Sequence, residues 1–406
     1  MNGVDFLEKL LDGIEVEWKA LGTLADLVRG NGLQKKDFTE AGVPAIHYGQ
    51  IYTYYGLSTT ETKSFVSPGL AKQLKKVDKG DVIITNTSEN LEDVGKALVY
   101  LGERQAVTGG HATILKPGEC LLGKYFAYFT QTEEFSVEKR KYAKGTKVID
   151  VSATDMAKIQ IPIPCPGIPK KSLEVQTEIV RILDAFAALT DKLTAELAAE
   201  LKARKKQYNY YRDQLLSFEK EDVEWKKLGS LVDINTGSKP PEILESATSF
   251  DYINAGTSRS GYSAGNNCAG DAVTTPSRGQ GGIGFVGYRS KPFWLGPLCY
   301  KLRSTDLTVL INKYLFYFLQ SRREMLLGLK KEGGVPAVNK TDLVQLEIPV
   351  PSLEEQKRIV AILDKFDALT NAITEGLPRE IELRQKQYEY YRDLLLSFPR
   401  PKEVEA

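Results

Sequence analysis

The stretch LEVQTEIVRILDAFAALT, residues 173–190, returns 180 positions later as LEEQKRIVAILDKFDALT, residues 353–370. The correspondence continues without a gap to Phe218 and Phe398, and 27 of the 46 aligned residues are identical. Similarity of this length within one chain indicates that one structural element is used twice. The repeat therefore determines the architecture of the chain.

Both copies have the apolar spacing of a long helix. From Ile179 and from Ile359 onward, apolar residues recur at steps of three and four, a heptad-type seam. Two additional four-residue steps fall on the tetrapeptide repeat TAEL-AAEL, residues 194–201, and such a stutter locally unwinds a supercoil. A helix of this kind would be about 65 Å long. We expect two antiparallel helices that pack as a coiled-coil spacer, with a kink or break at Gly376 and Pro378.

Each helix is introduced by a proline-containing stretch, IPIP at residues 161–164 and IPVP at residues 348–351. Proline fixes an extended backbone and delays the helix. We therefore expect Ser172 and Ser352 to be the N-caps of the two helices.

The segments between the helices also correspond to each other. Val16-Glu-Trp-Lys19 matches Val223-Glu-Trp-Lys226, and Gly80–Thr85 matches Gly270–Thr275, while most other residues differ. Met1–Glu15 takes the place of a continuation of the second helix, so the pattern is circular and predicts a pseudo-twofold molecule with neighbouring termini. The fold class expected is α+β, with two mixed α/β domains and two helical spacers. The predicted segments are 1–158 (first domain), 159–218 (central spacer), 219–345 (second domain) and 346–406 (C-terminal spacer).

Composition restricts the possible functions. The 406 residues are 42% hydrophobic and 26% charged, as in ordinary globular proteins, and no apolar run is long enough to span a membrane. The start lacks the order of a secretory signal, so a cytoplasmic location is expected. Four widely spaced cysteines and two histidines predict reduced thiols and no metal site. Residues 252–303 carry six cations against one anion, which suits a phosphate backbone.

Motifs that resemble catalytic sites are incomplete. Lys239-Pro-Pro-Glu242 lacks the aromatic residue of an adenine methyltransferase motif. Gly118–Lys124 resembles a P-loop but is followed by tyrosine instead of serine or threonine. The duplicated Glu-Trp-Lys at Glu17 and Glu224 imitates part of a nuclease site, and a packing role for the tryptophan is the better interpretation. The serious alternative to a binding protein is a coiled-coil scaffold, although a scaffold does not need two divergent domains.

The helical motifs QTEIVRILD, residues 176–184, and QKRIVAILD, residues 356–364, resemble the specificity subunit of type I restriction–modification systems. The tetrapeptide repeat and the string GLPREIELRQKQYEYYRD, residues 376–393, are similar to the type IC subgroup. The resemblance implies that each domain reads one half of a bipartite site in double-stranded DNA. It implies spacers that set the half-site distance and dock two modification subunits, with two restriction subunits added. It also implies no cofactor in this subunit, with S-adenosylmethionine, ATP and Mg in the partners, and no catalysis by the subunit itself.

Base reading needs polar or cationic side chains that project from loops into a groove. Matched frames should place such residues at matched positions, and the alternative for each of them is a structural turn or hairpin role. The predicted DNA-binding residues are His47, Gln50, Tyr52, Asn86, Thr87, Ser88, Arg104, Gln105, His111, Asn254, Arg259, Thr275, Ser277, Arg278, Gln280 and Arg289. The predicted spacer and partner-docking residues are Ile179, Phe186, Leu197, Tyr208, Tyr211, Ile359, Phe366, Tyr388 and Tyr391.

Overall fold

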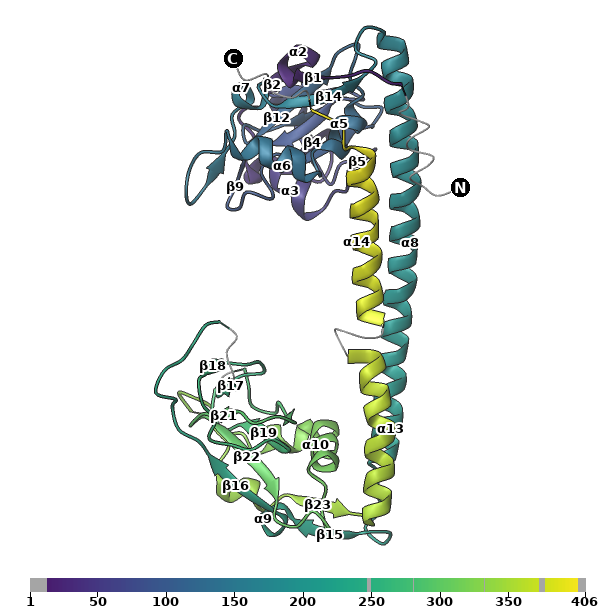
Figure 1. The fold of residues 1–406 in the computed structure, drawn as a ribbon. Helices are drawn as coiled ribbons and strands as arrows, with labels where there is room; N and C mark the ends of the chain where they lie inside the picture. The colour runs from purple at the N-terminus through teal and green to yellow at the C-terminus, as the bar shows by residue number, and fades with distance from the viewer. Residues whose placement is uncertain (1–12, 247–249, 280, 332, 372–376, 401–406) are drawn as a thin grey trace. The chain divides into compact units, whose positions relative to one another are not determined.

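The computed structural model describes residues 13–246, 250–279, 281–331, 333–371 and 377–400 (Figure 1). The chain forms two compact units: unit 1 combines Met1–Thr194 with Leu383–Ala406, and unit 2 is Ala195–Glu382. Each unit therefore contains one globular part and segments of both helical repeats. The finer division into four sequence segments stays a prediction.

Unit 1 contains two five-stranded sheets. The strands of the first are, in spatial order, β2 (Ala25–Arg29), β12 (Ala112–Pro117), β8 (Val82–Thr85), β10 (Ala97–Tyr100) and β5 (Ser58–Thr59). The strands of the second are β3 (Phe38–Thr39), β6 (Ser64–Val66), β4 (Val43–Ile46), β11 (Ala106–Thr108) and β7 (Lys75–Val77). Every residue of β8 is buried, as expected for the central strand of a covered sheet.

Short elements complete unit 1. The remaining strand pairs are β1 (Val16–Ala20) with β14 (Gln160–Pro164), and β9 (Thr87–Ser88) with β13 (Ile149–Asp150). The helices of the globular part are α2 (Leu21–Leu24), η1 (Lys35–Asp37), α3 (Tyr48–Thr53), α4 (Pro68–Ala71), α5 (Gly123–Phe129), α6 (Glu133–Arg140) and α7 (Ala153–Met156). The ring of Phe126 and the other aromatic side chains of α5 are buried in the main core of the unit.

Unit 2 repeats the frame with smaller sheets. Its four-stranded sheet has the order β16 (Val232–Thr236), β22 (Cys299–Ser304), β19 (Ala272–Pro276) and β20 (Gly287–Arg289). A three-stranded sheet has the order β18 (Gly261–Ser263), β17 (Phe250–Ile253) and β21 (Trp294–Leu295), and β15 (Glu224–Lys227) pairs with β23 (Glu347–Val350). The helices of the globular part are α9 (Leu228–Leu231), α10 (Asn312–Ser321), α11 (Arg323–Gly328) and α12 (Lys340–Leu343).

The duplicated Glu-Trp-Lys motif lies in corresponding strands of the two units. Trp18 in β1 pairs with Pro162, and Trp225 in β15 pairs with Pro349. The ring of Trp18 packs edge-on against Phe129, with centroids 6.1 Å apart, and that of Trp225 packs likewise against the corresponding phenylalanine of α10 at 6.4 Å. Both tryptophans therefore connect the start of a unit to its core, which is the packing role that was predicted.

The first helical repeat forms α8 (Pro169–Leu215), a continuous helix of 47 residues. The prediction that Ser172 caps this helix is wrong, because the helix starts three residues earlier at Pro169, a residue suited to the first helical position. Ser172 instead accepts a hydrogen bond from the Gln176 amide at 3.0 Å.

The second repeat forms α13 (Leu353–Asn371) and α14 (Leu377–Leu395). Ser352 is the N-cap of α13, since its hydroxyl accepts the backbone N–H of Glu355 at 3.2 Å, and this prediction is confirmed. Of the two residues at the predicted kink, Gly376 lies outside the described residues and Pro378 is the second residue of α14.

The two repeats pack against each other inside each unit. In unit 1, the start of α8 shares the core with the residues that end α14, and Phe186 contacts the ring of Tyr391 at 5.7 Å. In unit 2, the rings of Tyr208 and Tyr211 of α8 lie 6.4 and 6.1 Å from that of Phe366 of α13. In both units the paired helical segments run antiparallel (Figure 1).

The residues after α14 reach the first strand of unit 1. The indole N–H of Trp18 donates to the carbonyl of Pro399 at 3.1 Å, and the guanidinium of Arg400 lies 4.6 Å from the Trp18 ring centroid. In unit 2 the chain passes directly from the end of α8 to β15. The described end of the second repeat thus meets the described start of the chain. Residues 1–12 of the expected N-terminal continuation lie outside the described residues.

Candidate nucleic-acid interface

Four residues from three separate segments of unit 1 form one group, called here the histidine cluster: the exposed His111, the half-buried His47 and Tyr48, and the buried Thr87. The ring of Tyr48 lies 4.5 Å from that of His47 and 4.9 Å from that of His111. The hydroxyl of Thr87 is hydrogen-bonded to Nδ1 of His111 at 2.9 Å. The structure therefore brings together three predicted DNA-binding residues around a tyrosine.

Tyr48 was missed by the sequence reasoning, although it stands next to His47. Tyr48 is half-buried, and the exposed part of its ring, beside polar groups, provides a surface on which a base or sugar can stack. The adjacent His-Tyr pair contained the signal, and it was overlooked because only side chains that read hydrogen-bonding edges were considered.

His47 itself supports the local backbone. Its Nδ1 accepts the N–H of Gly49 at 3.2 Å, which caps α3, and its own N–H donates to Gln50 Oε1 at 3.1 Å. Partial burial lowers the pKa of His47, and the positive charges of Lys35 and His111 lower it further. By accepting the N–H of His47, the predicted reading residue Gln50 completes a capping box, and its amide nitrogen donates to Ser64 at 2.7 Å. Tyr52 lies 6.2 Å from Tyr48 at the edge of the cluster.

Two other predicted residues of unit 1 are built into the fold. Asn86 is fully buried, donating to the carbonyl of Val151 at 3.0 Å and accepting from Thr113 at 2.9 Å. Ser88 is also buried. A base contact by Asn86 would require both of its hydrogen bonds to open.

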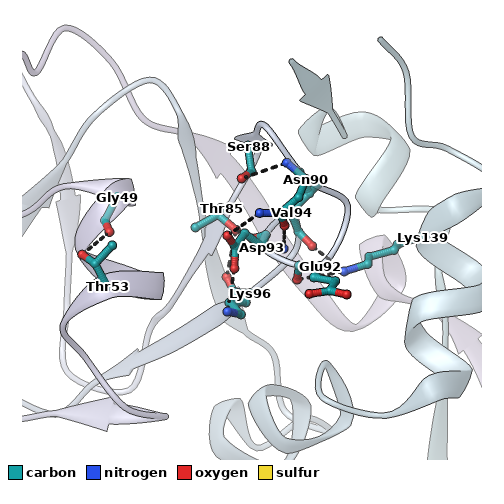
Figure 2. A network of polar contacts seen from close by, with 10 residues as sticks. All are labelled: Gly49, Thr53, Thr85, Ser88, Asn90, Glu92, Asp93, Val94, Lys96 and Lys139. Carbon is teal, nitrogen blue, oxygen red and sulfur yellow. Dashed lines mark hydrogen bonds and ion pairs between the residues drawn. The ribbon is translucent and has the colours of Figure 1, made fainter. Parts of the chain in front are cut away.

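The loop that follows Ser88 is tightly held (Figure 2). The amide of Asn90 donates to the carboxylate of Asp93 at 2.9 Å, and the amine of Lys96 pairs with the same carboxylate at 2.6 Å. On the other side, Lys139 of α6 donates to the carbonyl of Val94 at 2.6 Å. Burial lowers the pKa of Lys139 to about 8, and the neighbouring cations add to this effect. The backbone beside the histidine cluster is therefore fixed from two sides.

Arg104 and Gln105 are exposed and bond to other loops of unit 1. Arg104 donates to the carbonyl of Gly42 at 2.7 Å, and Gln105 donates to Asp78 at 2.6 Å. Their assignment to DNA binding stays a prediction.

In unit 2, the two predicted loops meet at Leu298. Its backbone N–H donates to Asn254 Oδ1 at 2.9 Å, and its carbonyl accepts the N–H of Ser277 at 2.9 Å. Thr275 and the side chain of Ser277 are buried, whereas Arg278 is exposed. The guanidinium of Arg278 makes no hydrogen bond or ion pair to a residue that the structure describes, and Gln280 lies outside the described residues.

Two further arginines lie in the basic stretch of unit 2. Arg259 pairs with Asp251 at 3.2 Å and lies over the ring of Tyr262 at 4.1 Å. Arg289 is half-buried, and its Nε is buried without a partner among the described residues. Burial lowers the pKa of Arg289, and the carboxylate of Asp251 opposes this. Arg278 is thus the predicted arginine of this unit whose exposed charge is not already engaged by a carboxylate.

The predicted docking residues fall into two groups by burial. Ile179, Ile359 and Tyr208 are buried in the unit cores. Partly exposed are Phe186, Leu197, Tyr211, Phe366, Tyr388 and Tyr391. In unit 2, Tyr211 and Phe366 line a cavity of about 430 Å³ between the end of α8 and α13.

The residues that imitated catalytic motifs have structural partners. The amine of Lys124 pairs with Asp184 at 2.8 Å, and that of Lys19 pairs with Glu17 at 3.1 Å. The four cysteines are free. Within the described ranges, no group of acidic, histidine or cysteine side chains could hold a metal ion, and no described helix is long and apolar enough to cross a membrane.

A second duplicated contact was also missed by the sequence reasoning. Asp184 of α8 receives Lys124 and Tyr128 of α5, and Asp364 of α13 receives Lys313 and Tyr317 of α10. The helices that carry these lysines and tyrosines, α5 and α10, share the pattern Lys-Tyr-x-x-Tyr-Phe, at residues 124–129 and 313–318. The offset of this match is 189, between the 180 of the helical repeat and the 207 of the unit starts, so a search at a fixed offset does not find it.

Comparison with known proteins gives a consistent result. Residues 14–203 and 220–383 match the family model of the type I restriction modification DNA specificity domain. The chain is 37% identical to the specificity subunit of a type I restriction enzyme from Escherichia coli, over the full length of both proteins. It is 33% identical to the specificity subunit of the E. coli enzyme EcoprrI, covering 92% of this chain and 93% of that one.

Two solved structures share the fold. One is a chain from a study of complex assembly and conformational transition of the type I restriction–modification system, with a TM-score of 0.68 and 18% identity, covering 94% of this chain and 97% of that one. The other is the HsdS subunit from Thermoanaerobacter tengcongensis, with a TM-score of 0.53 and 17% identity, covering 94% and 95%.

Proposed function

This chain belongs to the family of type I restriction–modification specificity subunits, and we propose that each of its two units reads one half of a bipartite DNA site. The observation that carries this proposal is one frame with two different reading surfaces. Unit 1 presents the histidine cluster, and unit 2 presents Arg278 beside Asn254. Different side chains on corresponding loops are what two unlike half-sites require.

The two surfaces predict different modes of recognition. The histidine cluster offers aromatic faces and imidazole nitrogens, which suit stacking and single hydrogen bonds. Arg278 offers a fork of donors that can bind O6 and N7 of guanine together. The stretch 252–303 as a whole, with six cations against one anion, favours the DNA backbone.

The helical repeats are proposed to have two further roles. They set the distance between the half-sites, and they dock two modification subunits, with two restriction subunits joining the complex. Partly exposed aromatic residues such as Tyr211, Phe366 and Tyr391 provide apolar surface for the docking.

We also infer that the chain has no catalytic centre and binds no cofactor. The residues nearest to catalytic motifs, Lys124 and Glu17, are engaged in structural ion pairs. S-adenosylmethionine, ATP and Mg would then act in the partner subunits. The purified chain should show no methyl transfer, ATP hydrolysis or DNA cleavage, and an activity that Lys124→Met abolishes would refute this inference.

Selection from a random duplex library tests the reading function. The chain, assembled with its modification subunits, should enrich sequences with two short conserved blocks separated by a random stretch of fixed length. A scaffold without reading function would enrich no sequence, and a single contiguous block would contradict one half-site for each unit.

A further inference from the structure

Each helical repeat carries a glutamine and an aspartate whose side chains bind the globular part of the same unit. In unit 1 these are Gln176 and Asp184, and in unit 2 they are Gln356 and Asp364. The two residues of each pair are eight positions apart, which is about 12 Å along a helix. Each unit is therefore held to its helix at two separated points.

The aspartate is engaged through both of its oxygens. Asp364 Oδ2 pairs with the amine of Lys313 at 2.8 Å, and Oδ1 accepts the hydroxyl of Tyr317 at 2.6 Å. In unit 1, Asp184 makes the same two contacts, with Lys124 at 2.8 Å and Tyr128 at 2.7 Å. Two bonds from one helix of the globular part converge on one carboxylate. This contact therefore fixes the orientation of that helix relative to the helical repeat as well as the distance between them.

The glutamine binds the backbone just before α5 in unit 1 and just before α10 in unit 2. Gln356 Oε1 accepts the N–H of Ile311 at 2.9 Å, and its Nε2 donates to the carbonyl of Val309 at 2.8 Å. Gln176 makes the same pair of bonds, to the N–H of Leu122 and the carbonyl of Cys120, each at 2.8 Å. Both glutamines are fully buried. Their partners in the globular part are backbone groups, so this contact does not depend on which side chains stand at those positions.

We propose that the glutamine, the aspartate and their partners form a common socket that positions each reading unit on its helix and so keeps the half-site spacing sharp. This proposal rests on the proposed reading function. The reading loops of the two units differ, yet the four bonds from the glutamine and the aspartate to the globular part are the same in both units. Gln176, Asp184, Gln356 and Asp364 are thus positioning residues that contact no base.

The environment of the socket favours a geometric role over a purely stabilising one. The side chains of Lys313 and Asp364 are 33% and 37% exposed, and partly exposed ion pairs contribute little to folding stability. The tyrosines are buried, and burial together with the nearby carboxylate raises the pKa of Tyr128 and of Tyr317. Their hydroxyls therefore stay protonated as donors to the aspartates. Loss of one contact should loosen the orientation of a unit before it unfolds the unit.

The test uses the full chain in complex with its modification subunits and a DNA library with both half-sites and spacers that differ by single base pairs. In Asp364→Asn and in Lys313→Met, the preference for the best spacer over its neighbours should fall by about fivefold, as expected for the loss of a partly exposed ion pair. Half-site sequences and the melting temperature should stay close to those of the parent. Asp184→Asn should give the same result through unit 1.

Lys365→Gln is the matched control, because Lys365 is exposed on the same helix beside Asp364. It should keep the sharp spacing. The double variant Lys313→Met with Asp364→Asn should be no worse than the more affected single variant, since both remove one contact. If Asp364→Asn does not assemble with the modification subunits, the spacer preference of Lys313→Met tests the proposal.

The outcomes separate this proposal from the proposed function. A parent complex without a preferred bipartite site would refute the reading function itself. A parent with a sharply spaced site and socket variants with equally sharp spacing would refute the socket alone. Variants that lose the half-site sequence instead of the spacing would place these residues in recognition and would also overturn the proposal.

Discussion

His47 shows how one side chain connects local backbone structure to the reading surface. Its Nδ1 must be unprotonated to accept the N–H of Gly49, while its ring lies against Tyr48. Protonation would remove the cap of α3 and place a positive charge near Lys35 and His111. The shape of the histidine cluster therefore depends on the charge state of His47.

The stability of the protein should consequently depend on pH through His47. The folded pKa of this residue lies below its ordinary value, so the unfolded chain takes up the proton first as the pH falls. The stabilising contribution is complete above about pH 6.5 and is lost as the pH falls through the lower folded pKa. His47→Asn keeps a capping acceptor without the titration. Melting curves from about pH 7.5 to 5 should show a smaller loss of stability on acidification in this variant, and an identical loss would contradict the assignment.

Arg278 is the residue at which base recognition is tested most simply. If it binds one guanine through two hydrogen bonds, Arg278→Ala should weaken binding by about 1–3 kcal/mol and relax one position of one half-site. A phosphate contact would instead weaken all sequences and reduce the salt dependence. Lys291→Ala, in the same basic stretch, is the control for a general charge effect. Unchanged affinity for specific and random duplexes would remove Arg278 from the interface.

At the level of elements, the hydroxyl of Tyr208 lies where α8 packs against α13 and has no hydrogen-bond partner among the described residues. This hydroxyl is buried, and burial raises its pKa to about 12. An unsatisfied buried hydroxyl costs about 1–3 kcal/mol. Tyr208→Phe should therefore increase the free energy of unfolding by about 1 kcal/mol in denaturant titrations. The repeat counterpart, Tyr388, is only partly buried, so Tyr388→Phe should change little, and destabilisation by Tyr208→Phe would show a missed role for its hydroxyl.

The aromatic contacts between the helices give a second prediction at this level. Tyr211 stacks on Phe366 and Tyr391 contacts Phe186, one contact in each unit. A charge placed at both positions would be poorly solvated beside these rings. Tyr211→Asp with Tyr391→Asp should release the modification subunits in size-exclusion chromatography or lower the melting temperature. A double variant that assembles and melts like the parent would show that these tyrosines serve neither packing nor docking.

The elements also show how far sequence reasoning can reach. Helical periodicity and proline stretches predicted both long repeats, because these signals are local. The cap at Ser352 was predicted correctly, but α8 starts at Pro169, since a proline can begin a helix as well as delay one. The burial of Asn86 and Thr275 was not predictable, because the side of a strand end that faces the core depends on contacts far along the chain. Arg278, His47, Thr87 and His111 could be proposed from the sequence because polar side chains at loop positions are a pattern of the sequence itself, whereas Tyr48 was missed.

In the whole molecule, we propose that recognition and spacing belong to different parts of the chain. The proposed reading surfaces lie on loops that differ between the units, while the helical repeats share 27 of 46 residues and the two sockets make the same contacts. Changes in the loops should alter the half-site sequences, and changes in the helices should alter the length of the spacer between the half-sites. The tetrapeptide repeat of α8 allows this division to be tested by an insertion that leaves the loops of both units unchanged.

The most direct measurement is methylation mapping of DNA modified by the parent complex and by a variant with one additional Thr-Ala-Glu-Leu after Leu197. Four residues add about 6 Å of helix and roughly 400° of rotation, and the net twist of about 40° can be absorbed as one more stutter. Since DNA rises about 3.4 Å per base pair, the non-specific spacer should lengthen by one or two base pairs, with both half-site sequences unchanged. An altered half-site, or an active variant with the original spacing, would contradict the claim that the helices set the distance.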